Sequence, residues 1–330
     1  MTSESRHVPV VRLAPAKLNL SLSVGGRRSD GYHDLHSVVV QLALSDVLTF
    51  TRAAGPTDSL HVSGHDPGAV AENLVVRAIA ALRRAVGPAS APPLAIRLDK
   101  RIPVAAGLGG GSSDAAAAID GALAAWDVEL DERRRRDIAG SLGSDVPLFL
   151  GGPVALIEGR GERVTELRGV VGRADIGVLL VVPAAAVPTS AVFAAFASGA
   201  RPTDPGASRA ASAHLAAELA AGLTARQLLD RAGILATAND LAAATVAVLP
   251  ALGPYRRALR RATRATVGQS GSGPALWALY ASEVAAEAAA MEVRAAVVDG
   301  RLPDVGGVPP SILVTTFASQ GVGSRGQEEP

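Results

Sequence analysis

The spacing of apolar residues along the 330-residue chain alternates between two regular patterns. Short segments in which apolar and polar residues alternate, or in which Val, Ile and Leu run together, predict strands. The predicted strands are Val8–Leu13, Leu18–Val24, Val38–Leu44, Val47–Thr51, Leu94–Leu98, Val154–Ile157, Ile176–Val182, Ala275–Tyr280 and Ile312–Thr316. A turn is expected at Pro15, between the first two strands, and a break near Ser45-Asp46, between the next two.

In other segments the apolar residues recur every three to four positions, which predicts helices. The predicted helices are Asn73–Val86, Asp114–Trp126, Asp131 to about Leu142, several alanine-rich helices up to about Ala265, and one that ends near Val297. Residues 197–212 are rich in Pro, Gly, Ser and Ala and predict a loop. Strands and helices mix without a regular βαβ repeat, so we expect an α+β fold, built as two lobes.

Composition excludes several classes of function but says little about the fold. Apolar residues make up 48% of the chain but aromatic residues only 3%, so the core must consist largely of Ala, Val and Leu. The formal net charge is +1 with both signs interspersed, which argues against a nucleic-acid surface. There is no cysteine, which excludes disulfides, thiolate metal sites and cysteine nucleophiles. The polar N-terminus precedes no signal-like or membrane-spanning run, so we expect a soluble, cytoplasmic protein.

The segment Pro103–Ser113, with four glycines followed by two serines, carries the clearest chemistry. Glycines let a backbone approach an anion closely, and the helix start that follows offers unpaired N–H groups, so a phosphate site is expected. Gly111 stands where a Walker A loop needs Lys, and Ser112 where a dinucleotide fingerprint needs Gly. A glycine-rich turn with capping serines is the alternative. Asp114 suits a helix start, but near a triphosphate it needs a metal or a lysine beside it.

Three other segments place polar side chains in unusual positions. Lys17 and Asn19 are two residues apart in an apolar strand and therefore share one face. Tyr32 and His33 follow an Asp-Gly turn, and Asp145 lies in a tight turn after a predicted helix. Taken singly, these patterns also suit simpler structural roles: an edge lysine, an exposed hairpin and, for Asp145, a local backbone cap.

Together and in order, these motifs resemble those of the GHMP family, the galacto-, homoserine, mevalonate and phosphomevalonate kinases. The motifs are Pro15–Asn19, Gly107–Ser113, Gly143–Pro147 and Ser270–Pro274, and one member of the family also shares Arg27–His33, Glu72–Leu74, Asp99–Pro103 and Asn239–Leu241. The resemblance runs from about Arg12 to Thr316. It implies an N-terminal ATP-binding lobe over residues 1–168, like ribosomal protein S5 domain 2. It also implies a ferredoxin-like C-terminal lobe over residues 169–317, and we expect a disordered tail over residues 318–330.

The resemblance further implies an ATP- and Mg²⁺-dependent kinase that phosphorylates a hydroxyl group of an alcohol joined to cytidine diphosphate, in isoprenoid precursor synthesis. Asp145 would accept or orient the hydroxyl proton, and Lys17 would keep Asp145 ionised and stabilise the transferring phosphoryl group. The implied ATP-binding residues are Asn73, Lys100, Pro103, Val104, Ala105, Ala106, Gly107, Leu108, Gly109, Gly110, Gly111, Ser112 and Ser113. The implied alcohol-binding residues are Asn19, Tyr32, His33, Thr189 and Phe193, and Ser113 is the implied metal ligand.

The expected partners are therefore ATP and a small cytidyl alcohol, with no nucleic acid and no membrane. A monomer and a homodimer are both compatible with the sequence. Two other functions remain: another GHMP kinase with a different alcohol, and a non-catalytic nucleotide-binding homologue. The presence of both Lys17 and Asp145 argues against the non-catalytic homologue.

Overall fold

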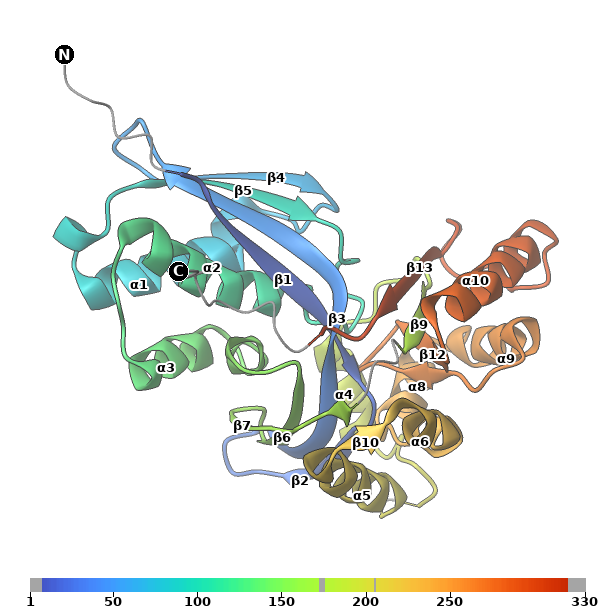
Figure 1. The fold of residues 1–330 in the computed structure, drawn as a ribbon. Coiled ribbons are helices and arrows are strands. Elements are labelled where there is room, and N and C mark those ends of the chain that lie inside the picture. Colours follow the sequence, from blue (N-terminus) through green and yellow to red (C-terminus); the bar gives the residue numbers. More distant parts are fainter. Residues whose placement is uncertain (1–7, 172–175, 205, 320–330) are drawn as a thin grey trace.

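A computed structural model describes residues 8–171, 176–204 and 206–319 of the chain. Two sheets and the helices around them form an α+β structure, as expected (Figure 1). The strands of the larger, seven-stranded sheet are β1 (Val10–Asn19), β2 (Ser23–Arg27), β3 (His33–Arg52), β4 (Ser59–Gly64), β5 (Leu94–Lys100), β6 (Val154–Gly159) and β7 (Arg163–Glu166). The helices α1 (Leu74–Val86), α2 (Gly110–Trp126) and α3 (Glu132–Leu142) pack on this sheet and on one another around a shared apolar cluster.

Strand β3 is the centre of this sheet and runs for 20 residues without interruption. The predicted break near Ser45-Asp46 is therefore wrong. On one side β3 pairs with β1, and on the other with β6 along its first part and β5 along its second. The Asp46 side chain does not form a turn, because its carboxylate accepts hydrogen bonds from the backbone N–H groups of Arg101 and Ile102.

The predicted turn at Pro15 is wrong for a related reason. Strand β1 continues through Pro15, and its pairing with β3 only shifts register between Pro15 and Lys17. Proline lacks a donor and is tolerated in a strand where the ladder is irregular or at an edge. The chain instead leaves the sheet after Asn19 and resumes as β2 at Ser23. Lys17 and Asn19 therefore lie at the end of a strand, where a loop of the other lobe reaches them.

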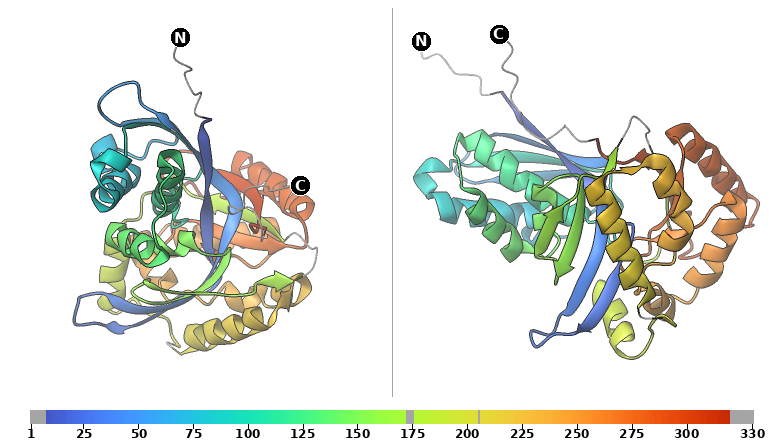
Figure 2. Two further views of the ribbon diagram at one scale, coloured as in Figure 1. Left: turned by 60° about the vertical axis from the view of Figure 1, so that its left-hand side comes forward. Right: turned by 60° about the horizontal axis from the view of Figure 1, so that its bottom comes forward.

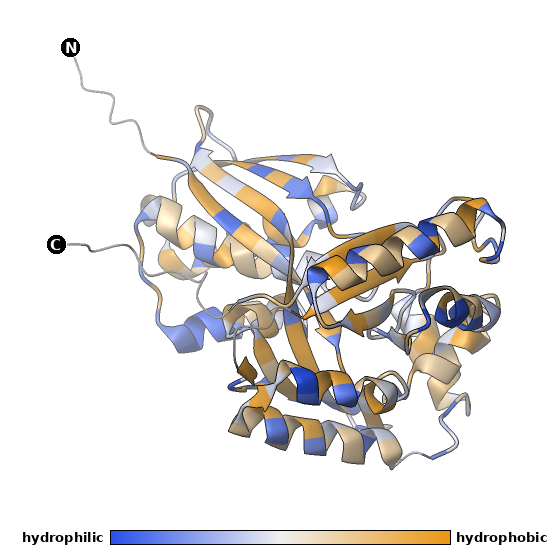
Figure 3. Ribbon diagram, turned by 45° about the vertical axis from the view of Figure 1, so that its right-hand side comes forward, coloured by the Kyte–Doolittle hydropathy of each residue, from blue (hydrophilic) through white to orange (hydrophobic). Residues whose placement is uncertain are grey.

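The smaller sheet is antiparallel, with strands in the order β11 (Gly268–Gln269), β12 (Leu276–Tyr280), β9 (Gly177–Val182) and β13 (Ser311–Thr316). One face of it packs against α9 (Leu252–Thr263) and α10 (Glu283–Val298). The opposite face contributes Val178, Leu180 and Trp277 to the largest apolar cluster, which also contains Ala16 and Leu18 of β1. The two lobes thus share one core. Figure 3 shows many hydrophobic residues in the strands of both sheets, and both hydrophobic and hydrophilic residues along the helices.

The segment between β9 and β11 holds shorter elements. They are α4 (Thr189–Ala197), α5 (Ala207–Ala221), α6 (Ala225–Asp230), α7 (Ala232–Leu235), α8 (Ala242–Val248) and β10 (Leu223–Thr224), which pairs in parallel with β8 (Val170–Val171), a short strand before β9. The predicted loop over 197–212 is wrong in its second half, because α5 begins at Ala207. Ser208 and Ser212 are buried there, and α5 lies along β2 and β3 (Figure 2).

Two further differences concern weak patterns. Strands β4 and β7 are not predicted, since β4 has little apolar character and β7 only four residues. The predicted disorder over 318–330 falls, from residue 320 onward, outside the described residues. Among the described residues, no helix combines the length and apolar character that crossing a bilayer requires.

Candidate active site

The glycine-rich segment connects β5 to α2 and begins the helix earlier than predicted. Helix α2 starts at Gly110 rather than Asp114, so both serines lie in its first turn. Gly107 and Gly109 have φ values of +82° and +72°, a left-handed conformation that glycine adopts at little cost. The segment therefore presents the unpaired N–H groups of a helix start, which is the arrangement expected for a phosphate site.

Two of these glycines are also required by packing. A Cβ atom on Gly107 would lie 2.5 Å from the carbonyl oxygen of Ser270. A Cβ on Gly109 would lie 2.8 Å from Cγ of Lys17 and 2.9 Å from Cζ of Phe149. Gly111 differs, because its nearest neighbour would be Cδ1 of Leu74 at 3.8 Å. At Gly109 the loop thus packs tightly against Lys17, the candidate catalytic lysine, whereas at Gly111 there is room for a side-chain atom.

A cavity of about 410 Å³ lies along the loop. Its lining includes Asn73, Lys100 and every predicted loop residue from Pro103 to Ser112, together with Asp114. Ser113 is not part of this lining: it is buried, and its hydroxyl has no hydrogen-bond partner among the described residues. The structure therefore gathers twelve of the thirteen predicted ATP-binding residues on the lining of one cavity, and Ser113 is the exception.

The lysine that Asp114 requires is Lys100. The ammonium group of Lys100 donates hydrogen bonds to Asp46 and, at 2.7 Å, to Asp114, and all three side chains are buried. Burial raises the pKa of Asp114 to about 7, although the Lys100 charge opposes this. The positive charge of the Lys100 ammonium therefore compensates the negative charge of the two carboxylates beside the phosphate loop. It is not free to bind a ligand in the cavity.

Lys17 and Asn19 lie together at the end of β1, each 6% exposed. Lys17 Nζ donates to Asn19 Oδ1 at 2.5 Å, and the Lys17 backbone N–H donates to Leu108 of the phosphate loop at 2.8 Å. Burial lowers the pKa of Lys17, and the negative charge of Asp145 partly opposes that change. Asp145, half-buried in the turn after α3, is thus close enough to act on Lys17, although no ion pair joins them among the described residues.

The C-terminal lobe closes this site through the loop Ser270–Pro274. Ser270 Oγ donates to the carbonyl of Gly107 at 3.0 Å and accepts from the backbone N–H of Asn19 at 3.3 Å. Asn239 holds this loop by donating from its amide nitrogen to the carbonyl oxygens of Gln269 and Gly271. The four predicted motifs therefore meet at one place. The roles of Ser270 and Asn239 are not predicted by the sequence analysis, although it quotes both motifs.

The residues predicted to bind the alcohol divide into two groups. The buried His33 ring lies 5.8 Å from the ring of Phe193 and 5.6 Å from that of Phe196. Its Nδ1 lies 3.0 Å from the carbonyl oxygen of Gly25. A carbonyl only accepts, so Nδ1 carries the hydrogen, and in the neutral ring Nε2 is an acceptor. Phe196 is missed by the sequence analysis, although its spacing of three residues from Phe193 on a helix is a usable signal.

The second group lies around this ring cluster. Tyr32 is 52% exposed, and the guanidinium of Arg160 lies 5.6 Å from its ring centre. Thr189, the first residue of α4, shares a hydrogen bond of 3.0 Å with Ser272 of the Ser270–Pro274 loop. The hairpin with Tyr32, the helix with Phe193 and the loop beside Lys17 are therefore linked to one another. Arg160 and Ser272 are further residues that the sequence analysis misses.

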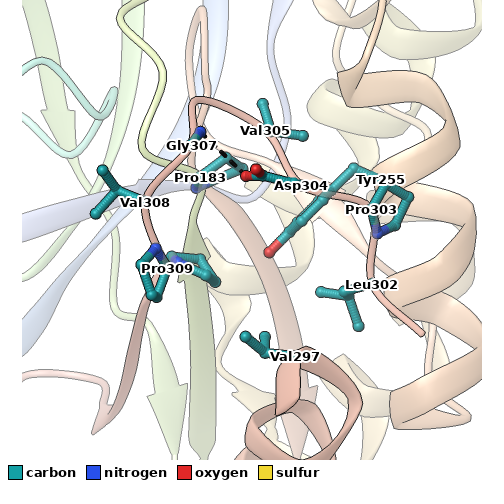
Figure 4. A pocket seen from close by; sticks show the side chains of 11 residues that line it. Pro183, Tyr255, Val297, Leu302, Pro303, Asp304, Val305, Gly307, Val308 and Pro309 are labelled. Carbon is teal, nitrogen blue, oxygen red and sulfur yellow. Dashed lines mark hydrogen bonds between the residues drawn. The ribbon is translucent and has the colours of Figure 1, made fainter. Parts of the chain in front are cut away.

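A second cavity, of about 220 Å³, lies in the C-terminal lobe between α9, the end of α10 and the loop before β13 (Figure 4). The buried Tyr255 points its hydroxyl into it, opposite Val297 and Pro309. None of the predicted site residues lines this cavity. Within the described part of the chain, no group of three or more His, Asp or Glu side chains is arranged to hold a metal ion.

Comparison with known proteins agrees with this geometry. The model of the GHMP kinases N terminal domain matches residues 73–152, and that of the GHMP kinases C terminal domain matches 216–299. A relative from Mesorhizobium japonicum, named 4-diphosphocytidyl-2-C-methyl-D-erythritol kinase, is 36% identical over 85% of this chain and 90% of its own. One of the same name from Pelotomaculum thermopropionicum is 38% identical over 86% of this chain and 94% of its own.

Solved structures give the same result. A crystal structure of 4-(cytidine 5'-diphospho)-2C-methyl-D-erythritol kinase matches with a TM-score of 0.69 and 31% identity, over 94% of this chain and 99% of that one. Homoserine kinase from Cytophaga hutchinsonii, at 17% identity and a TM-score of 0.66 over 97% of this chain and 98% of that one, shares the fold. This chain belongs to the GHMP kinases, ATP-dependent enzymes that phosphorylate small molecules, and groups with the relatives named 4-diphosphocytidyl-2-C-methyl-D-erythritol kinase.

Proposed function

We propose that this chain transfers the γ-phosphoryl group of ATP to the 2-hydroxyl of 4-diphosphocytidyl-2-C-methyl-D-erythritol, a step of non-mevalonate isoprenoid precursor synthesis. One observation carries the proposal. Lys17 and Asn19 contact the phosphate loop on one side and the Ser270–Pro274 loop on the other, and that second loop is bonded to the helix that carries Phe193. A single strand end thus connects a nucleotide cavity to a cluster of aromatic rings.

For the nucleotide, we place the phosphates of ATP on residues 103–113 and the adenine near Asn73 and Lys100. The 410 Å³ cavity that these residues line supports this placement, as do the free N–H groups at the start of α2. Asn73 Oδ1 already accepts from the N–H of Val75, so its amide nitrogen is the group left to donate to the base. Lys100 contributes to the cavity wall without a free charge, since Asp46 and Asp114 hold its ammonium.

In the transfer step, the oxygen of the 2-hydroxyl bonds to the γ-phosphorus while the bond to the β-phosphate oxygen breaks and ADP leaves. Asp145 accepts or orients the hydroxyl proton, and Lys17 stabilises the charge on the transferring group. Burial alone favours a neutral Lys17, whereas Asp145 and the Asn19 carbonyl oxygen favour the ammonium. The charge of this lysine is thus maintained by the same residues that surround the reacting hydroxyl.

We also propose that the nucleotide binds with Mg²⁺, which neutralises charge on the β- and γ-phosphates when present. Ser113 suits the role of a ligand, because its buried hydroxyl oxygen has no partner in the described protein. Since no cluster of acidic side chains is available among these residues, the phosphate oxygens would supply most of the remaining ligands.

For the alcohol substrate, we propose that the cytosine binds against Tyr32, His33 and Phe193, with Thr189 beside the sugar or diphosphate. Because Nδ1 of His33 donates to Gly25, Nε2 is an acceptor suited to the exocyclic amine of cytosine. A uracil presents a carbonyl oxygen in that position and would place two acceptors against each other. This site therefore selects cytidine over uridine.

We further propose an N-terminal lobe over residues 1–168 and a C-terminal lobe over 169–317, supported by the change of sheet between Glu166 and Gly177. Either a monomer or a homodimer is compatible with this site, which one chain completes. The dependence on ATP supports a cytoplasmic location.

The test is formation of ADP from ATP and Mg²⁺ with the cytidyl alcohol, mevalonate and homoserine as parallel substrates. We expect turnover only with the cytidyl alcohol. Turnover with another alcohol instead would identify a different GHMP kinase. ATP binding without turnover of any alcohol would identify a non-catalytic homologue.

A further inference from the structure

A buried series of hydrogen bonds leads away from the candidate catalytic lysine. Lys17 Nζ donates to Asn19 Oδ1, and Asn19 Nδ2 donates to Ser37 Oγ at 2.8 Å. Ser37 Oγ in turn donates to the backbone carbonyl of Ser21 at 2.6 Å. None of these four residues is more than 6% exposed, so water does not compete for the bonds. Ser37 lies on β3 and does not itself reach the phosphate loop.

The hydrogen count fixes the direction of this series. A serine hydroxyl has one hydrogen, and Ser37 gives it to the Ser21 carbonyl, which can only accept. The Ser37 oxygen therefore faces Asn19 as an acceptor, and Asn19 must turn its NH₂ toward Ser37 and its oxygen toward Lys17. An amide holds one orientation when both of its ends have complementary partners.

The far end of the series anchors Ser21 to the C-terminal lobe. Ser21 Oγ accepts from the backbone N–H of Val38 at 3.2 Å and donates to Ser212 Oγ of α5 at 2.9 Å. Ser212, which is fully buried, also lies 2.8 Å from Nδ1 of His36. The Ser21 residue whose carbonyl receives the Ser37 hydrogen is consequently held in place by strand β3 and helix α5.

We propose that Ser37 is a positioning residue, which holds the Asn19 amide so that its oxygen stays on the Lys17 ammonium during phosphoryl transfer. The proposal rests on the proposed function of Lys17. Without the Ser37 hydroxyl, the amide nitrogen of Asn19 is left buried with no acceptor, a costly state. The side chain then rotates toward another acceptor, and its oxygen leaves the lysine.

The consequence is a change in the protonation of Lys17. Burial already lowers the pKa of this ammonium, and the groups that favour its charged form are Asp145 and the Asn19 oxygen. A hydrogen bond to the charged form favours that form. Loss of the Asn19 contact therefore lowers the pKa of Lys17 further, and the fraction of active, charged enzyme falls at alkaline pH.

The test compares Ser37→Ala with Ser23→Ala, a control that removes another buried serine hydroxyl for which the structure shows no hydrogen bond. The chain has only two lysines, Lys17 and Lys100, so lysine-labelled protein gives two NMR signals whose pH titrations are followed directly. In Ser37→Ala we expect the Lys17 midpoint to move to lower pH and kcat to fall about tenfold, with KM for ATP unchanged. Ser23→Ala should resemble the wild type.

An unchanged Lys17 midpoint in Ser37→Ala would overturn the proposal, even if kcat fell, because a purely structural defect lowers activity at every pH. If Ser37→Ala does not fold, Ser37→Cys keeps the volume and replaces the oxygen by a weak acceptor, and the same downward shift is expected. The titration uses no substrate. An inactive wild type would therefore refute the proposed phosphoryl transfer while the test of Ser37 remained valid.

Discussion

Substituting Gly109 by alanine should destabilise the protein, whereas the same substitution at Gly111 should not. At Gly109 the new Cβ would lie 2.8 Å from Lys17 Cγ and 2.9 Å from Phe149 Cζ, at a φ of +72°. The left-handed conformation costs an alanine about 1–2 kcal/mol. Overpacking adds about 1–3 kcal/mol. Gly109→Ala should therefore lower the free energy of unfolding by about 2–5 kcal/mol.

At Gly111 the same methyl group meets only Leu74 Cδ1, at 3.8 Å, and the backbone is helical. Alanine stabilises a helix by about 0.5–1 kcal/mol relative to glycine, so Gly111→Ala should be neutral or slightly more stable. Because Gly111 lines the nucleotide cavity, the methyl group should nevertheless obstruct the approach of the phosphates. We expect KM for ATP to rise while KM for the alcohol changes little.

Denaturant unfolding of both variants, with KM measured for each substrate, separates these effects. A Gly109→Ala protein as stable as the wild type would refute the packing argument. Equal weakening of ATP and alcohol by Gly111→Ala would show that the loop is only a structural turn. Gly140→Ala is a suitable control, since it exchanges a glycine of α3 whose added Cβ would meet no atom within 4 Å.

Three more outcomes are expected. Asp145→Asn should fold normally and lower kcat by roughly 10²–10⁴, the usual contribution of a positioned general base, and wild-type turnover would exclude that role. CMP should compete with the alcohol but not with ATP. Phe193→Ala should weaken the binding of CMP, because stacking contributes about 1–3 kcal/mol per base. Competition of CMP with ATP would contradict the proposed cytosine site. Since burial raises the pKa of Asp114 to about 7, its native state binds a proton that the unfolded chain has lost. Stability should fall between about pH 4 and pH 7 in the wild type and fall less in Asp114→Asn, as denaturant titrations at several pH values would show.

Sequence reasoning predicted which residues lie together best where a motif is contiguous. The residues of the phosphate loop, and Lys17 with Asn19, follow from local patterns, and the structure brings each set together. Local spacing suffices in these cases, because a strand or helix start fixes which neighbours share a face. His33 and Phe193, which only the family resemblance joined, also lie side by side.

What escaped prediction depends on contacts between distant segments. Asp46 reads as a turn residue in the sequence, yet in the fold it binds Lys100 and two backbone N–H groups. Ser212 reads as part of a loop, but its bonds to Ser21 and His36 lie inside a helix–sheet contact. Where the local pattern is weak, distant hydrogen-bond partners determine the conformation of a polar residue. The spacing of residues along the chain does not predict those partners.

The burial of both lysines has a practical consequence for studying this enzyme. Lys17 and Lys100 are 6% and 3% exposed, and each ammonium is hydrogen-bonded. Reagents that acylate primary amines need an accessible neutral amine, so neither side chain is open to attack while the site is intact. Acylation of these lysines then measures how often the structure around each of them opens, and ATP should slow it at Lys17 by holding the phosphate loop against that residue. A chain this poor in lysine therefore carries its own chemical reporter of active-site opening, with no label introduced.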